Sequence, residues 1–152
     1  MTVDTTERRT SVSKVIEFEP STIFAVVSDA SLHSVIDGSG TVKGNGGKSE
    51  MLRLGSRFGM RMRILVPYKM SNEVVEFETD RLIAWQHFGK HRWRFELEPV
   101  GSGTKVTETF DWSTSRQPSV IEALGYPKRH EANIERTLAQ LDAYLTNRAN
   151  SL

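Results

Sequence analysis

The chain contains no cysteine. This absence excludes disulfide bonds, thiolate nucleophiles, and the zinc or iron–sulfur sites that use cysteine ligands. The sequence also has little net charge, because 20 Lys and Arg residues balance 19 Asp and Glu residues and leave a formal charge of +1. A nearly neutral chain has no overall field that would gather nucleic acid or an anionic membrane, so such a partner would need a local patch.

Long apolar segments are missing as well. No apolar run approaches the roughly 20 residues needed to span a bilayer, and the polar start MTVDTTERRTSVS lacks the apolar core of a secretory signal. We therefore expect a cytoplasmic protein with no membrane partner. At 152 residues the chain has the length of one domain, and a domain of this size hides roughly 68 to 70% of its unfolded surface.

Common catalytic and cofactor motifs are also missing. The four histidines, His33, His87, His91 and His130, do not have the HExxH spacing of a zinc site, so we expect no metal. The run GNGGKS lacks the glycine spacing of a phosphate-binding loop, and GSGTVKG is not followed by the strand-to-helix crossover of a dinucleotide site. No GxSxG serine-hydrolase elbow is present. We expect no cofactor.

The first third of the chain predicts one strand and short helices. Residues 1–9 are expected to form a flexible tail, and a strand is expected over residues 10–18. The segment EPSTIFAVVSDASLHSVID predicts one or two short helices, with Pro20 in a first helical turn and Asp29 as a cap. The glycine-rich run at 37–50 predicts a loop that contains a short strand.

Alternating patterns predict about five or six antiparallel strands in the middle of the chain. In SRFGMRMRI, apolar residues alternate with arginine and glycine, so one face is apolar and the other basic. The segments YKMSNEVVEFE, LIAWQHF, HRWRFELEP and TKVTETFDW supply the remaining strands. A two-residue turn at 79–80 would create three cross-strand pairs: Glu76 with Ile83, Val74 with Trp85, and Asn72 with His87.

The turn near Gly89 allows two registers. A two-residue turn would place Trp85 on the face of Arg94, whereas a three-residue loop would place it on the face of Trp93. We favour the three-residue loop, because exposing the Trp85 indole would forgo up to roughly 4 to 6 kcal/mol at about 25 cal/mol per Å².

The last quarter of the chain predicts a short helix or turn, and then a long amphipathic helix from Pro127. Apolar residues recur there at spacings typical of one helical stripe, namely Ile134, Leu138, Leu141 and Leu145. His130 lies one turn before Ile134 on the same stripe. Such a helix must lay its stripe on the apolar face of the sheet, so the sequence predicts an α+β fold with the helix held in a curved sheet.

This order of elements resembles the START-related SRPBCC superfamily, and within it the polyketide cyclase/dehydrase group of bacteria. The segments that carry the likeness are IEFEPSTIFAVVSD, HSVIDGSGTV, NEVVEFETDRLIAWQ, GTKVTETFDW and NIERTLAQLDAYL, which together extend over roughly residues 10–147. We place a single START-like domain at residues 10–148.

The resemblance implies a helix-grip fold. In that fold a curved antiparallel sheet of about six or seven strands wraps around a long C-terminal helix, and two short helices follow the first strand. The resemblance also implies a cavity for an apolar small molecule. Members of the superfamily include lipid carriers, hormone receptors, cyclases and chaperone activators, so the fold alone supplies no reaction.

The predicted inner face of the sheet is rich in aromatic and thioether side chains. Such a lining suits an adaptable apolar ligand, and the alternative is an ordinary filled core. The candidate ligand-binding residues are Phe58, Met60, Met62, Tyr68, Met70, Asn72, Trp85, Trp93, Phe95, Phe110, Trp112, His130 and Ile134.

Four polar residues, Asn72, His87, Glu108 and His130, interrupt this lining. A buried carboxyl group needs a partner or takes up a proton. If Glu108 and His130 meet between sheet and helix, they could act as general acid and base on a polyketide-like carbonyl, an effect of about 10² to 10⁴-fold. The candidate catalytic residues are Glu108, His130, His87 and Tyr68; alternatively, each is a satisfied or exposed structural side chain.

Three classes of function are open. We favour a carrier or sensor, monomeric or homodimeric, that binds a hydrophobic small molecule such as a lipid, polyketide or aromatic metabolite. The second class is a polyketide cyclase, aromatase or dehydratase. The third is a protein or RNA interaction module that uses a basic outer stripe of Arg57, Arg61, Arg63, Arg92, Arg94 and Lys105. Because glutamates dilute this stripe, we expect no nucleic acid partner.

Overall fold

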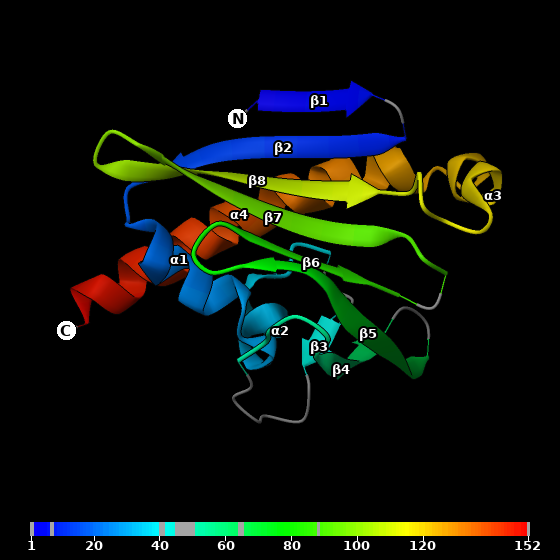
Figure 1. Ribbon diagram of the computed structural model, residues 1–152, viewed down its shortest axis with the longest axis horizontal. Helices are drawn as coiled ribbons and strands as arrows, with labels where there is room; N and C mark the ends of the chain where they lie inside the picture. The colour runs from blue at the N-terminus through cyan, green and yellow to red at the C-terminus, as the bar shows by residue number, and fades with distance from the viewer. Residues whose placement is uncertain are drawn as a thin grey trace.

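The computed structural model describes residues 2–6, 8–39, 42–44, 51–63, 66–87 and 89–151. The eight strands found in these residues form one antiparallel sheet in the order β1-β2-β8-β7-β6-β5-β4-β3 (Figure 1). The strands are β1 (Thr2–Thr6), β2 (Arg9–Ile16), β3 (Val42–Gly44), β4 (Arg57–Arg63), β5 (Pro67–Glu78), β6 (Leu82–Gln86), β7 (Arg92–Val100) and β8 (Gly103–Asp111). The helices are α1 (Pro20–Val27), the single 3-10 turn η1 (Ala30–Leu32), α2 (His33–Ile36), α3 (Pro118–Ala123) and α4 (Tyr126–Asn150).

Helix α4 crosses one face of the sheet, behind β7 and β8 in the view of Figure 1. Its predicted apolar stripe is buried, with Ile134, Leu138 and Leu141 fully covered and Leu145 3% exposed. These side chains join one core with residues of the facing strands, such as Val12 and Phe110. The structure therefore confirms the predicted α+β fold, in which the sheet curves around a long C-terminal helix. Burial of each such side chain contributes about 1.5 to 3 kcal/mol.

The two short helices after β2 begin as predicted. Pro20 is the first residue of α1, where its fixed φ suits the helix and its missing N–H has no helical partner to lose. Asp29 caps the following turn, because its side chain accepts a hydrogen bond from the Ser31 N–H at 3.0 Å.

The β5–β6 hairpin differs from the prediction in its turn. The turn contains three residues, 79–81, so Glu78 lies opposite Leu82 and Glu76 opposite Ala84 rather than Ile83. A bulge between Val74 and Glu76 then restores the predicted partner of Val74, which is Trp85. The bulge also turns Glu76 to the outer face.

The β6–β7 hairpin has the predicted odd loop. Trp85 lies opposite Trp93, and the His87 N–H donates to the His91 carbonyl at 3.3 Å beyond the end of β6. Trp85 is consequently 9% exposed. The two indoles share the inner face, as the burial argument required.

The N-terminal edge of the sheet is a correction to the sequence prediction. Residues 2–6 form β1 antiparallel to β2, with Val3 opposite Val12, where we expected part of a flexible tail. The segment TVDTT is rich in β-branched residues but has no apolar alternation, so only its pairing with β2 identifies it as a strand. This extra edge strand brings the sheet to eight strands among the described residues, compared with the six or seven expected.

Candidate functional site

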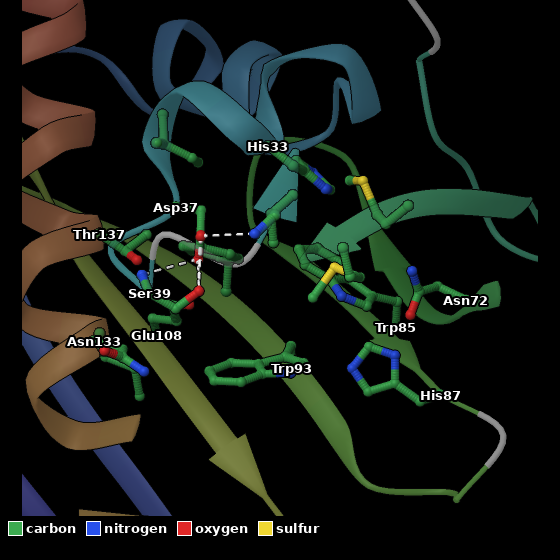
Figure 2. A pocket seen from close by; sticks show the side chains of 16 residues that line it. His33, Asp37, Ser39, Asn72, Trp85, His87, Trp93, Glu108, Asn133 and Thr137 are labelled. Atoms are coloured by element: carbon green, nitrogen blue, oxygen red, sulfur yellow. Dashed lines mark hydrogen bonds between the residues drawn. The ribbon is translucent and has the colours of Figure 1, made fainter. Parts of the chain in front are cut away.

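A cavity of about 120 Å³ lies between the concave face of the sheet and helices α2 and α4 (Figure 2). Its apolar walls are formed by Ile36, Val42, Met60, Met62, Trp85, Trp93, Phe95 and Ile134. Its polar lining residues are His33, Asp37, Ser39, Asn72, His87, Glu108, Asn133 and Thr137. The strands and α4 supply the lining residues that the sequence predicted. Helix α2, with Asp37, Ser39 and Val42, adds a third wall.

The aromatic wall is held by ring contacts. Trp85 stacks on His33 with ring centroids 4.8 Å apart, and Phe58 meets Trp85 edge-on at 5.8 Å. His33 is fixed in turn, because its Nε2–H donates to the Val27 carbonyl at 2.9 Å. Burial lowers the pKa of His33, so this imidazole is favoured in its neutral form. Phe58, a predicted ligand-binding residue, thus contacts the rings of Trp85 and His33 and does not line the cavity.

The loop after α2 is fastened to α4 at a close contact. The Gly38 N–H donates to the Thr137 hydroxyl at 2.8 Å, and the Gly38 carbonyl accepts from Arg136 Nε at 2.8 Å. A Cβ atom at position 38 would lie 2.3 Å from the Asn133 carbonyl oxygen, so only glycine fits here. This contact fixes the distance between the α2 wall and the helix.

Asp37 is the one carboxyl group of the described lining with its partners in place. It accepts hydrogen bonds from the Ser39 N–H at 3.2 Å, from the Ser39 hydroxyl at 2.7 Å and from the Val42 N–H at 3.2 Å (Figure 2). The side chain closes the loop and fixes the entry of the chain into β3. Its role is therefore explained by local structure.

Three other lining residues have buried side-chain atoms with no hydrogen-bond partner. These atoms are Asn72 Oδ1, His87 Nδ1 and Glu108 Oε2. Asn72 is 3% exposed and Glu108 is 5% exposed, so bulk water does not replace the missing partners. An unsatisfied buried polar group costs about 1 to 3 kcal/mol, and atoms of this kind in a cavity wall are suited to bind a ligand.

Burial also controls the charge of these groups. It raises the pKa of Glu108 well above the usual range, and the charge of Asp37 adds to the shift, so the neutral carboxylic acid is favoured. Burial, together with the charges of His91 and His130, lowers the pKa of His87 to about 3. The cavity thus carries a neutral acid and a neutral imidazole.

The structure places three more predicted residues, Phe110, Trp112 and His130, outside the lining. His130 lies behind the wall, with its ring against Trp93 at 4.9 Å and Phe110 at 4.4 Å, so it does not share the cavity with Glu108. Trp112 stacks on Phe110 and donates from its indole N–H to Glu122 of α3 at 2.9 Å. Phe110 therefore packs near the start of α4 and Trp112 packs against α3, and neither lines the cavity.

Two predicted residues, Tyr68 and Met70, lie on β5 opposite Met62 and Met60. Their side chains lie outside the described part of the structure. Their assignment as ligand-binding residues, and that of Tyr68 as a catalytic candidate, stays a prediction.

Sequence reasoning missed the wall formed by α2 and part of α4. His33, Ile36 and Asp37 have the i, i+3, i+4 spacing of one helical face, and Asn133 and Thr137 are four residues apart on α4. These spacings were available signals. Helix α2 is too short to show a repeating stripe, and on α4 the leucine stripe is the stronger pattern.

On the convex face of the sheet, several of the arginines of the basic stripe meet carboxylates. Glu76 lies 3.4 Å from Arg92 and 3.3 Å from Arg94, which also contacts Glu96. Arg57 lies 3.3 Å from Glu73. These pairs favour a solvated surface over a nucleic-acid interface, and the interaction module stays a prediction.

Two further features are absent from the described residues. No group of three or more His, Cys, Asp or Glu side chains in this part of the chain could hold a metal ion. Within the same residues, no helix combines the length and apolarity needed to cross a membrane.

Comparison with known proteins agrees with the fold. The chain is 36% identical over 154 aligned residues to the uncharacterized protein Rv0088 of Mycobacterium tuberculosis, covering 97% of this chain and 69% of that protein. A crystal structure of a Rhodobacter sphaeroides protein matches with a TM-score of 0.74 at 14% identity, covering 96% of this chain and 97% of the other. The solution structure of an AHSA1-like protein from Aeromonas hydrophila matches with a TM-score of 0.64 at 18% identity, covering 90% and 93% of the two chains.

A family model described as polyketide cyclase / dehydrase and lipid transport matches residues 7–146, which is most of the chain. The structural likeness to the AHSA1-like protein agrees with the helix-grip fold. Together the family and the fold support a role in binding a hydrophobic ligand. The chain therefore belongs to the polyketide cyclase / dehydrase and lipid transport family.

Proposed function

We propose that this protein is a carrier or sensor that binds a hydrophobic small molecule in the cavity between the sheet and α4. One observation carries the proposal: an aromatic cavity contains three buried polar atoms, on Asn72, His87 and Glu108, that have no protein partner. A core that served only packing would fill this space and satisfy these groups. A ligand with an apolar body and a few polar atoms accounts for both features.

The cavity size favours a compact ligand. Its volume of about 120 Å³ is of the order of the apolar cavity of about 150 Å³ that binds benzene in an engineered protein. The flexible side chains of Met60 and Met62 form part of the wall and can adapt to different shapes. We therefore expect the ligand to place one aromatic ring in the cavity as it stands, with a second ring fitting when Met60 and Met62 move aside. The ring can also be the end of a longer lipid or polyketide.

Binding is tested by measuring thermal stabilisation with a panel of fatty acids, flavonoids, naphthols and small aromatic polyketides. A ligand present at about 100 times its Kd adds about 2.7 kcal/mol to the stability of the folded state. Quenching of Trp85 and Trp93 fluorescence, because both indoles line the cavity, provides a second signal.

A matched pair of variants locates the binding. Met62→Trp introduces an indole from a half-buried lining position, and Arg61→Trp introduces the same indole one residue away on the exposed convex face. Met62→Trp should fill the cavity and abolish the ligand-induced shift in Tm, while Arg61→Trp should retain it. The proposal is wrong if no compound in the panel binds, or if both variants bind like the unchanged protein.

A second candidate function is acid catalysis, and the state of Glu108 is the observation that favours it. A buried, protonated carboxyl group can donate a proton to a carbonyl oxygen in a cyclisation or dehydration. Glu108→Gln should then keep binding but lose turnover of a cyclising polyketide substrate by about 10² to 10⁴-fold. Full turnover by Glu108→Gln would remove this role.

A further inference from the structure

We propose that the ligand is an uncharged aromatic molecule with a carbonyl that accepts a hydrogen bond from Glu108 and a hydroxyl that donates to Asn72. Molecules that carry a carboxylate, including fatty acid anions, are excluded from the cavity. This inference rests on the proposed function and defines the chemical class of its ligand.

The polar atoms stand at two separate ends of the cavity. In Figure 2, Glu108 lies at the end that also holds Asp37, Asn133 and Thr137, whereas Asn72 and His87 lie at the opposite end, with Trp93 between the two groups. A flat molecule on Trp93 would therefore reach one polar group with each end. Its rings would lie in the apolar middle of the cavity, against the indoles and the two methionines.

The two ends call for different ligand atoms. Glu108 is favoured as a neutral carboxylic acid, which has one O–H to donate. A ligand carbonyl is the matching acceptor. At the other end the buried atom of Asn72 without a partner is the carbonyl oxygen Oδ1, which accepts a hydrogen bond and matches a ligand hydroxyl.

The lining supplies no positive charge for an anion. The lining residues that the structure describes include four titratable groups, His33, Asp37, His87 and Glu108, and no lysine or arginine. Burial favours the neutral form of both lining histidines and of Glu108 by the pKa shifts given above. From α4, His130 adds no positive charge behind Trp93 at neutral pH, because burial first, with the charges of His91 and Arg129, lowers its pKa to about 4.

Asp37 makes the Glu108 end unfavourable for a carboxylate. Its hydrogen bonds from Ser39 and Val42 hold the carboxyl group in place beside this end, where its charge contributes to the raised pKa of Glu108. A second anion there would meet repulsion and would lose its hydration. Arg136 lies outside the lining, and its guanidinium already donates to the Gly38 carbonyl and to Asn133. A ligand acid must therefore take up a proton before it enters.

The experiment compares two probes of equal shape, an acetylnaphthol and the corresponding hydroxynaphthoate. They differ only in a methyl ketone that replaces a carboxylate. Isothermal titration at pH 7 should show the naphthoate binding about 1,000-fold more weakly, because a carboxyl group with a pKa near 4 is about 0.1% protonated at that pH. The affinity of the naphthoate should rise about tenfold from pH 7 to pH 6, while the affinity of the ketone should change little over that range.

Variants assign the two ends. Glu108→Leu should weaken the acetylnaphthol about tenfold relative to plain naphthalene, whereas Glu108→Gln, which keeps a neutral donor, should restore most of the loss. Asn72→Leu should weaken the acetylnaphthol by a similar factor but should not affect the methyl ether of the same compound, which lacks the hydroxyl donor.

The possible outcomes separate this inference from the proposed function. If no compound of the panel binds, including naphthalene and the acetylnaphthol, the proposed function itself is wrong, and this inference fails with it. If both naphthalene probes fail while another compound of the panel binds, the inference is overturned and the binding function stands. If naphthalene binds but the naphthoate equals or exceeds the ketone at pH 7, or the ketone gains nothing over naphthalene, the inference is overturned and the binding function stands. A naphthoate weaker by the expected factor, with the expected pH slope, supports the inference.

Discussion

Polar side chains of β2 and β8 on the convex face of the sheet contact one another, whereas several polar atoms in the cavity on the concave face have no partner. On the convex face, the Ser11 and Thr109 hydroxyls lie 2.7 Å apart, Ser13 and Thr107 repeat this contact at 2.7 Å, and Arg9 contacts Asp111 at 3.0 Å. On the concave face, the polar atoms of Asn72, His87 and Glu108 that face the cavity lack partners. These hydroxyl and carboxylate contacts therefore serve the sheet, and the three cavity atoms are available to a ligand.

Strand β8 contributes side chains both to the contacts of the convex face and to the core and cavity of the concave face. Residues 107, 109 and 111 point outward into hydroxyl and carboxylate contacts, while Glu108 and Phe110 point into the core. Protein stability and ligand affinity should consequently respond to different mutations within a few residues of each other.

The largest expected effect is the loss of the concave aromatic core. Phe110 is 2% exposed and contacts the rings of Trp93, Trp112 and His130. Phe110→Ala should lower the free energy of unfolding by about 3 to 5 kcal/mol in urea denaturation. Lys105→Ala, on the exposed face of the same strand, should change it by less than about 0.5 kcal/mol. Equal effects would contradict the division between the faces.

The next effect concerns the contact between the α2 loop and the helix. Gly38→Ala would place a methyl group 2.3 Å from the Asn133 carbonyl oxygen, so we expect a loss of about 1 to 3 kcal/mol and weaker ligand binding. Gly59→Ala is the matched control, since nothing lies within 4 Å of a Cβ atom at that convex position. A neutral result for Gly38→Ala would show that the loop is not held as described.

The third effect is acid sensitivity, which should arise from the concave side. His87 and His130 have folded-state pKa values of about 3 and about 4, below the ordinary value of 6.5. The unfolded chain therefore binds protons below pH 6.5 that the folded chain does not, and stability falls as the pH drops, by about 1 kcal/mol per pH unit for each histidine. The difference between the urea midpoints at pH 7 and pH 5 should shrink in a His87→Gln/His130→Gln variant. The remaining difference is expected from His33 and His91, whose pKa values burial also lowers.

Glu108 has the opposite sign. Its raised pKa means that its contribution to stability is complete below the ordinary value of 4.5 and is lost as the pH rises through the folded-state pKa. Glu108→Gln should therefore gain stability relative to the unchanged protein on the alkaline side. A gain that appeared only at acid pH would contradict the neutral state of this carboxyl group.

The smallest effects are expected from two substitutions that should change protein stability in opposite directions. Asn72→Leu removes a buried amide whose oxygen has no partner and should stabilise the unliganded protein by up to about 1 kcal/mol while weakening a hydroxyl-bearing ligand. Thr109→Val removes the partner of Ser11 and should destabilise the protein by about 0.5 to 1 kcal/mol without changing binding. The same sign for both variants would break the comparison.

Local patterns were sufficient to predict most of the architecture. The spacing of Ile134, Leu138, Leu141 and Leu145 defined the buried side of α4, and the alternation of Trp93, Phe95 and Leu97 defined the inner face of β7. Burial energy was sufficient to choose the three-residue loop that places Trp85 opposite Trp93. Each of these features depends on residues close together in sequence or on one dominant energy.

The features that were missed depend on distant parts of the chain. The three-residue turn and the Val74–Trp85 pair are compatible only because β5 has a bulge between Val74 and Glu76. Strand β1 is defined only by its pairing with β2. The contact of Gly38 with Thr137 joins residues 99 positions apart. Likewise, the expected meeting of Glu108 with His130 depended on which turn of α4 lies over β8, and the structure places Asn133, Ile134 and Thr137 over the cavity instead.

We expect the cavity between the sheet and helices α2 and α4 to receive an uncharged aromatic ligand. The most direct measurement is a crystal structure of the protein grown with the acetylnaphthol. We predict that the rings lie against Trp85 and Trp93, with the ketone oxygen within hydrogen-bond distance of Glu108 and the hydroxyl within that distance of Asn72. Naphthol density outside the cavity, or a cavity closed by its own side chains in the complex, would contradict the account.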